Sequence, residues 1–181
     1  MPRLFVGIYP DSVVRDALAS LATPLRGFRW TPPEQLHLTL RFLGELDDDA
    51  AARAEAALGT VSVGAFLLEP AGVGIFPPRG PAGVVWVGFG TTHPHLFQLR
   101  QRVDDALLAA GVPLELRPFQ VHLTVARVRE ASAGTVAEFV KRHRAFTAPP
   151  WRATAFTLME SRLAPAGAEH SVRRLYPLAG D

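Results

Sequence analysis

Two short segments, residues 37–40 (HLTL) and 122–125 (HLTV), each place a histidine and a threonine two positions apart among apolar residues. On a β-strand, residues i and i+2 project from the same face, so each segment presents an imidazole and a hydroxyl roughly 6–7 Å apart. That spacing fits one phosphate group. A histidine pKa near neutrality lets one imidazole accept a proton while another donates one. Two facing copies therefore predict in-line displacement at phosphorus, with threonine hydroxyls donating hydrogen bonds to the non-bridging oxygens of the phosphate.

The simpler explanation of one such motif is a hydrogen-bonded structural histidine beside a threonine that favours β-structure. Two copies on matched strands favour the catalytic interpretation. This chemistry needs no metal or cofactor, and we expect none. The chain has no cysteine. We interpret His93 and His95 as a surface pair at a helix start without an obvious third ligand, and the acidic run at residues 47–49 as a helix entrance rather than a metal site.

Apolar periodicity predicts the elements that must position these residues. The two motif strands are expected at residues 36–43 and 121–128, each preceded and followed by a helix. Residues 30–33 (WTPP) are expected to form a turn. Further strands are expected near residues 3–9, 66–76, 84–89, 153–160 and 172–177, and helices near 12–21, 48–59, 94–110 and 132–144.

The balance of these elements predicts the fold class. Strands outnumber helices and many neighbouring strands are joined by turns, which favours an antiparallel α+β fold over a doubly wound parallel sheet. The order of elements around one motif is roughly repeated around the other. We therefore expect a single domain over residues 1–181, built of two pseudo-symmetric lobes of antiparallel sheet with outer helices, flanking a central cleft.

Composition limits the classes of protein that the chain can represent. Its 181 residues, 48% hydrophobic and 20% charged, indicate a globular protein. We find no signal peptide and no apolar stretch of membrane-spanning length, so we expect a cytoplasmic monomer without membrane contact. A net charge of +2 excludes a polycation that coats nucleic acid indiscriminately. Lys141 is the only lysine beside 18 arginines, and arginine is well shaped for phosphate, although genomic bias also explains the total.

The chain resembles a known family, the two-histidine (2H) phosphoesterases. It is most similar to the bacterial and archaeal RNA 2′,3′-cyclic phosphodiesterases once called 2′-5′ RNA ligases. The resemblance implies a bilobal α+β fold and hydrolysis of a terminal 2′,3′-cyclic phosphate to a 2′-phosphate. The segments that carry it are residues 3–8 (RLFVGI), 30–46 (WTPPEQLHLTLRFLGEL), 119–128 (FQVHLTVARV) and 156–163 (FTLMESRL).

The resemblance also implies roles that the spacing alone does not assign. His37 corresponds to the proton donor to the 3′ leaving oxygen, and His122 corresponds to the proton acceptor that activates water. Thr39 and Thr124 are expected to bind the phosphate. Arg127 corresponds to the arginine of the family that contacts the phosphate.

The two candidate phosphate-binding arginines differ in their position along the motif strands. Strict alternation puts Arg127 on the apolar face of its strand, so it needs a β-bulge or the strand end to reach the cleft. Arg41 has the parity of the cleft face and is a second candidate phosphate ligand.

Aromatic side chains near the motifs are candidates to stack on a nucleobase, as recognition of single-stranded RNA requires. We take Trp30, Phe119 and His170 as these candidates and assign Phe42 to the core. His170 stands where the family commonly has a tyrosine, and Val121 stands where a proline usually precedes the second histidine.

Several functions remain open at this point. The expected partners are RNA ends or nucleotides with a 2′,3′-cyclic phosphate, tRNA fragments among them, and the reverse reaction would join RNA ends through a 2′-5′ bond. One alternative is a cyclic phosphodiesterase acting on a small nucleotide-derived metabolite. Another is an RNA-binding module without turnover, against which the retention of two complete motifs argues.

Overall fold

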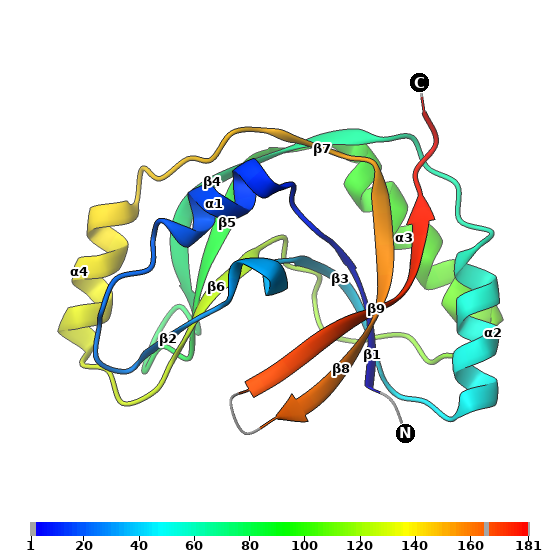
Figure 1. Cartoon of the computed structure of the whole chain (residues 1–181), viewed down its shortest axis with the longest axis horizontal. Coiled ribbons are helices and arrows are strands. Elements are labelled where there is room, and N and C mark those ends of the chain that lie inside the picture. The colour runs from blue at the N-terminus through cyan, green and yellow to red at the C-terminus, as the bar shows by residue number, and fades with distance from the viewer. Residues whose placement is uncertain (1–2, 165–166, 181) are drawn as a thin grey trace.

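The structure is a computed structural model that describes residues 3–164 and 167–180. In this part of the chain, nine strands form one curved sheet in which every pairing between strands is antiparallel, with helices packed around it (Figure 1). The elements are β1 (Arg3–Ile8), α1 (Ser12–Ala19), β2 (Phe28–Trp30), the 3₁₀ turn η1 (Pro33–Gln35), β3 (Leu38–Glu45), α2 (Asp48–Leu58), β4 (Phe66–Phe76), β5 (Val84–Thr92), α3 (Pro94–Ala109), β6 (Leu123–Val128), α4 (Ala133–His143), β7 (Trp151–Ala153), β8 (Ala155–Ala164) and β9 (Gly167–Pro177).

The sheet consists of two halves, each of which has a motif strand at its inner edge. One half has the order β3-β1-β8-β9, and the other has the order β6-β5-β4-β7. They join where β3 pairs with β6, with Leu38 and Leu123 as Cα partners, and β2 also pairs with β6. The predicted α+β fold with two lobes of antiparallel sheet is therefore confirmed, and the lobes share one continuous sheet.

The helices begin where the sequence supplies caps. Asp11 caps α1 by accepting a hydrogen bond from the Val14 backbone N–H at 2.9 Å, and Asp47 caps α2 through the Ala50 N–H at 2.7 Å. The acidic run at residues 47–49 is thus the predicted helix entrance. Helices α2 and α3 lie together beside one half of the sheet, and α4 lies at the far end of the molecule (Figure 1).

The core fixes which face of each motif strand points outward. Leu38 and Leu40 of β3, and Leu123 and Val125 of β6, are all almost fully buried. Burying each such side chain contributes about 2 kcal/mol to folding. A slip of one residue in either strand would expose these side chains, so their burial holds the intervening motif residues on the opposite face.

Both motif strands begin two residues later than predicted, and β2 lies where part of a turn was expected. Each strand starts immediately after its motif histidine. The physical reason is local, because the carbonyl oxygens of Gln35 and Gln120 accept hydrogen bonds from the motif imidazoles. β2 forms because Trp30 finds a pairing partner in Ala126, which lies far away in the sequence.

Within the described ranges, none of the helices combines the length and the apolar character that crossing a bilayer requires.

Candidate active site

The two motif segments line the same cleft, a cavity of about 650 Å³. His37 precedes Leu38 and His122 precedes Leu123, and these two leucines are cross-strand partners whose Cα atoms lie about 5 Å apart. Because the leucines point into the core, the histidines and threonines beside them point the other way. All four motif side chains, His37, Thr39, His122 and Thr124, line this cleft.

The two imidazoles are oriented in the same manner. The Nδ1–H of His37 donates to the carbonyl oxygen of Gln35 at 2.7 Å, and the Nδ1–H of His122 donates to that of Gln120 at the same distance. A carbonyl oxygen only accepts, so the hydrogen of each neutral ring lies on Nδ1. Each Nε2 is therefore left as the atom that can exchange a proton with a bound molecule.

The surroundings of His37 favour its neutral form. Its ring packs against Phe5 and Tyr9, with centroid separations of 4.8 Å and 5.5 Å. Burial lowers the His37 pKa to about 4, although the hydrogen bond to Gln35 acts in the opposite direction. Electrostatic interactions with His170, His122 and Arg127 lower the His37 pKa further. Burial also lowers the His122 pKa, opposed by its bond to Gln120. Both imidazoles therefore have pKa values below the usual histidine value, and a bound anion would raise both.

A β-bulge brings Arg127 into the cleft. Val85 pairs with Ala126, whereas Trp86 pairs with Thr124, so β6 has one extra residue at this point. The bulge reverses the alternation after Thr124, and Val125 and Ala126 are both buried. Arg127 consequently returns to the cleft face, and it is both exposed and part of the cleft lining.

The same kind of bulge turns Arg41 away from the cleft, so its prediction as a phosphate ligand is wrong. Val6 pairs with Arg41 and Gly7 with Thr39, which leaves Leu40 as the extra residue of β3. Arg41 is 1% exposed and is absent from the cleft lining. Phe42 occupies the cleft face instead and is 47% exposed, so its assignment to the core is also wrong.

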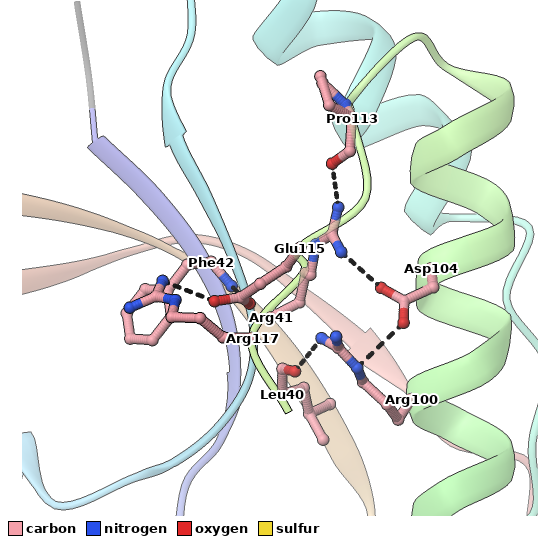
Figure 2. A network of polar contacts seen from close by, with 8 residues as sticks. All are labelled: Leu40, Arg41, Phe42, Arg100, Asp104, Pro113, Glu115 and Arg117. Atoms are coloured by element: carbon pink, nitrogen blue, oxygen red, sulfur yellow. Dashed lines mark hydrogen bonds and ion pairs between the residues drawn. The ribbon is translucent and has the colours of Figure 1, made fainter. Parts of the chain in front are cut away.

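Arg41 belongs to a buried polar network that ties β3 to α3 and to the segment before the second motif (Figure 2). Its Nη1 contacts the Asp104 carboxylate at 2.9 Å, and its Nη2 donates to the Pro113 carbonyl oxygen. Arg100 pairs with the second Asp104 oxygen at 3.0 Å and also donates to the carbonyl oxygen of Leu40. The network therefore satisfies a backbone group at the bulge and holds the chain that leads to His122.

We expect Arg41→Met to lower the free energy of unfolding by about 3 kcal/mol, because it leaves part of a buried charged network without its partner. Urea unfolding measures this change, and Arg142→Met serves as the control. Arg142 forms an ion pair with Glu138 on the surface of α4 with 69% of its side chain exposed, so its loss should cost under about 1 kcal/mol. Unchanged stability combined with a large rise in KM for a phosphate ester would restore Arg41 as a phosphate ligand.

All three predicted stacking residues line the cleft. The Trp30 indole N–H donates to the Thr23 carbonyl oxygen at 2.8 Å, which anchors its ring. The Phe119 ring has the Arg100 guanidinium 5.4 Å from its centroid. The His170 ring lies edge-on to that of His37 with centroids 5.2 Å apart, so it adjoins the reactive group more directly than the sequence indicates.

The sequence analysis did not identify several residues that line the cleft or pack against His37. Phe5 and Tyr9 enclose His37, but they belong to a continuous apolar run whose two faces cannot be distinguished by alternation. Arg29 and Arg100 line the cleft as well. Neither lies in a motif. The pairing of β2 with β6, in which Arg29 is the partner of Arg127, is visible only in three dimensions.

Known proteins share both the sequence pattern and the fold. The sequence profile of the family described as LigT like Phosphoesterase matches residues 8–86 and 90–169, so each matched segment contains one histidine–threonine motif. An RNA 2′,3′-cyclic phosphodiesterase from Archaeoglobus fulgidus is 32% identical over 177 residues, which are 96% of this chain and 99% of that protein. One from Thermus thermophilus is 32% identical over 203 residues, covering 99% of this chain and 91% of that protein.

Solved structures share the fold of this chain. A crystal structure of a Thermus thermophilus protein matches with a TM-score of 0.81 and 27% identity, covering 99% of both chains. Escherichia coli LigT, crystallised in complex with 3′-AMP, matches with a TM-score of 0.79 at 24% identity and shows the same fold. From the profile match over most of its length and the two full-length relatives, the chain belongs to the LigT-like phosphoesterase family.

Proposed function

We propose that this protein is an RNA 2′,3′-cyclic phosphodiesterase that opens a terminal 2′,3′-cyclic phosphate to a 2′-phosphate. The observation that carries this proposal is the convergence of two histidines and two threonines on one cleft, each imidazole presenting an unprotonated Nε2. The activity named for the full-length relatives from Archaeoglobus fulgidus and Thermus thermophilus supports the choice of substrate.

The reaction transfers one proton from the attacking water to a histidine and one proton from the other histidine to the leaving oxygen. A water oxygen attacks phosphorus while Nε2 of His122 accepts a proton from that water. The bond between phosphorus and the 3′ oxygen breaks, and Nε2–H of a protonated His37 donates its proton to the leaving oxygen. Thr39, Thr124 and Arg127 stabilise the negative charge on the non-bridging oxygens. The products are a 2′-phosphate and a free 3′-hydroxyl.

The assignment of donor and acceptor follows the family resemblance, and it requires His37 to be protonated when the substrate is bound. Its pKa of about 4 means that the phosphodiester anion must stabilise the imidazolium on binding. A substrate with sulfur in place of the 3′ bridging oxygen tests the assignment, because a thiolate leaves without protonation. His37→Ala should be impaired much less on this substrate, whereas His122→Ala should remain impaired. The reverse pattern would exchange the two roles.

The proposed activity itself is tested with adenosine 2′,3′-cyclic monophosphate and with an RNA oligomer that carries the same end, in the presence of a chelator. We expect the 2′-phosphate as the product on both substrates. Activity that disappears in the chelator would contradict the two-histidine mechanism. Production of the 3′-phosphate would contradict the leaving-group assignment. Binding without turnover would instead favour an RNA-binding module.

The pH dependence follows from the lowered pKa values of the two histidines. The active form has one imidazole protonated and the other neutral, so activity is lost below the lower pKa and above the upper one. For the free enzyme, the lower limit of the kcat/KM profile is the His37 pKa of about 4. The upper limit lies below the usual histidine value of 6.5, because burial also lowers the His122 pKa. We therefore expect kcat/KM to peak between these two pH values. The kcat profile should lie at higher pH because the bound anion stabilises both imidazolium forms. A kcat/KM that is still rising at pH 8 would contradict this account.

A further inference from the structure

The two ends of the cleft differ in chemistry because the motif strands diverge. β3 and β6 run in opposite directions from the Leu38–Leu123 pair, so the residues after each motif lie at opposite ends. Each motif strand has its own bulge, and in both strands it brings the fifth residue after the histidine to the cleft face. That residue is Arg127 at one end and Phe42 at the other. The end that has no Arg127 therefore presents an aromatic ring.

Phe42 is part of an ordered platform rather than an isolated exposed ring. The Arg117 guanidinium lies 5.1 Å from the Phe42 centroid, and the Phe5 ring, which contacts His37, lies 6.1 Å away. The Glu115 carboxylate holds both Phe42 and Arg117 in place. It accepts a hydrogen bond from the Phe42 backbone N–H at 3.2 Å and pairs with Arg117 at 2.6 Å (Figure 2). The Glu115 side chain is 13% exposed, whereas that of Arg117 is 73% exposed.

The charge around this platform suits a polyanion. Among the described cleft-lining residues, Glu115 is the only carboxylate, and its pairing with Arg117 already offsets its charge. Five arginines line the same cleft: Arg3, Arg29, Arg100, Arg117 and Arg127. Three of these are paired within the protein, Arg3 with Glu45, Arg100 with Asp104 and Arg117 with Glu115. Among the described residues, Arg29 and Arg127 have no ion pair, so the cleft keeps one positive charge more than a single cyclic phosphate would neutralise.

We propose that Phe42 and Arg117 form a stacking subsite for the nucleobase that precedes the terminal, cyclic-phosphate nucleotide of an RNA chain. This rests on the proposed function and extends it to the part of the substrate upstream of the reaction. Phe42 lies three residues beyond Thr39, roughly 10 Å along β3, a span that the next nucleotide with its base can cover. Bases of single-stranded RNA stack on aromatic rings and on guanidinium planes, and such stacking tolerates any base.

The experiment compares kcat/KM for three substrates: adenosine 2′,3′-cyclic monophosphate, the adenosine dinucleotide with the same cyclic end, and that dinucleotide with its upstream base removed. The wild-type protein should prefer the full dinucleotide over the abasic one about tenfold. Arg117→Ala and Phe42→Leu should bring this ratio close to one, since leucine keeps the apolar volume without the aromatic face. Phe42→Trp should keep the preference.

Arg142→Ala is the matched control, because Arg142 is 69% exposed and ion-paired like Arg117 but lies on α4. It should leave the preference for the full dinucleotide unchanged. Equal losses on all three substrates in Arg117→Ala, or a wild-type protein indifferent to the upstream base, would overturn the subsite. A wild-type protein that hydrolyses none of the three would instead refute the proposed function, and the subsite with it.

Discussion

Replacing either motif histidine with alanine should lower kcat for a nucleoside 2′,3′-cyclic phosphate by about 10³-fold, within the range of general acid–base catalysis. Each imidazole is held by a 2.7 Å hydrogen bond at Nδ1 that leaves its Nε2 able to exchange a proton, so alanine removes the proposed proton-transferring atom. The double variant His37→Ala/His122→Ala should be little worse than either single one, because the two groups act in one step. Steady-state kinetics with the pure proteins measures all three values.

His143→Ala provides the control for this series. His143 is the last residue of α4, and its ring packs against Phe139 with a centroid separation of 4.4 Å, away from the cleft lining. Its removal should change kcat less than about twofold, since it touches no reacting group. Losses that multiply in the double variant, or a single variant that retains wild-type activity, would show that the two histidines do not serve one reaction.

The second large effect is expected at the motif threonines. Thr39→Val and Thr124→Val each keep the branched shape favoured in a strand but lose the hydroxyl, and each should lower kcat by about 10²-fold. The reason is that a donor to the non-bridging oxygens contributes most when negative charge builds up in the transition state. KM should change much less than kcat, since the ground-state phosphate keeps its other partners.

Thr92→Val tests whether the loss of any strand threonine has such an effect. Thr92 is the last residue of β5, partly exposed and outside the cleft lining, so this variant should retain full activity. If Thr39→Val and Thr124→Val change KM alone, the hydroxyls assist binding rather than stabilise the transition state. That outcome would contradict the placement of the phosphorus between the two motifs.

The motif strands show which parts of this site can be read from sequence. Alternation around His37 and Thr39, and around His122 and Thr124, places their side chains opposite buried leucines and valines, as the structure shows. The helix entrance at residues 47–49 was equally readable, since Asp47 accepts a hydrogen bond from the backbone N–H three residues later. These features depend on local periodicity and local hydrogen bonds, which neighbouring residues specify.

The β-bulges mark the point at which sequence reasoning fails. One extra residue at Leu40 and one at Val125 reverse the alternation, so Arg41 enters the interior while Phe42 and Arg127 reach the cleft. Nothing in the local pattern signals a bulge, because both positions have ordinary apolar residues. At the bulge of β3, the backbone groups of Leu40 and Phe42 form hydrogen bonds with Arg100 and Glu115. These two residues come from distant segments of the chain. Tertiary structure therefore decides which residue after each motif faces the cleft.

The most direct test of the central claim is a crystal structure of the protein with a nucleoside vanadate, in which five oxygens surround vanadium as they would surround phosphorus during in-line displacement. We predict that the Nε2 atoms of His37 and His122 lie within about 3.2 Å of the two apical oxygens, on opposite sides of the vanadium. Contact of only one imidazole with the vanadate, or binding of the vanadate outside the cleft, would contradict the two-histidine mechanism.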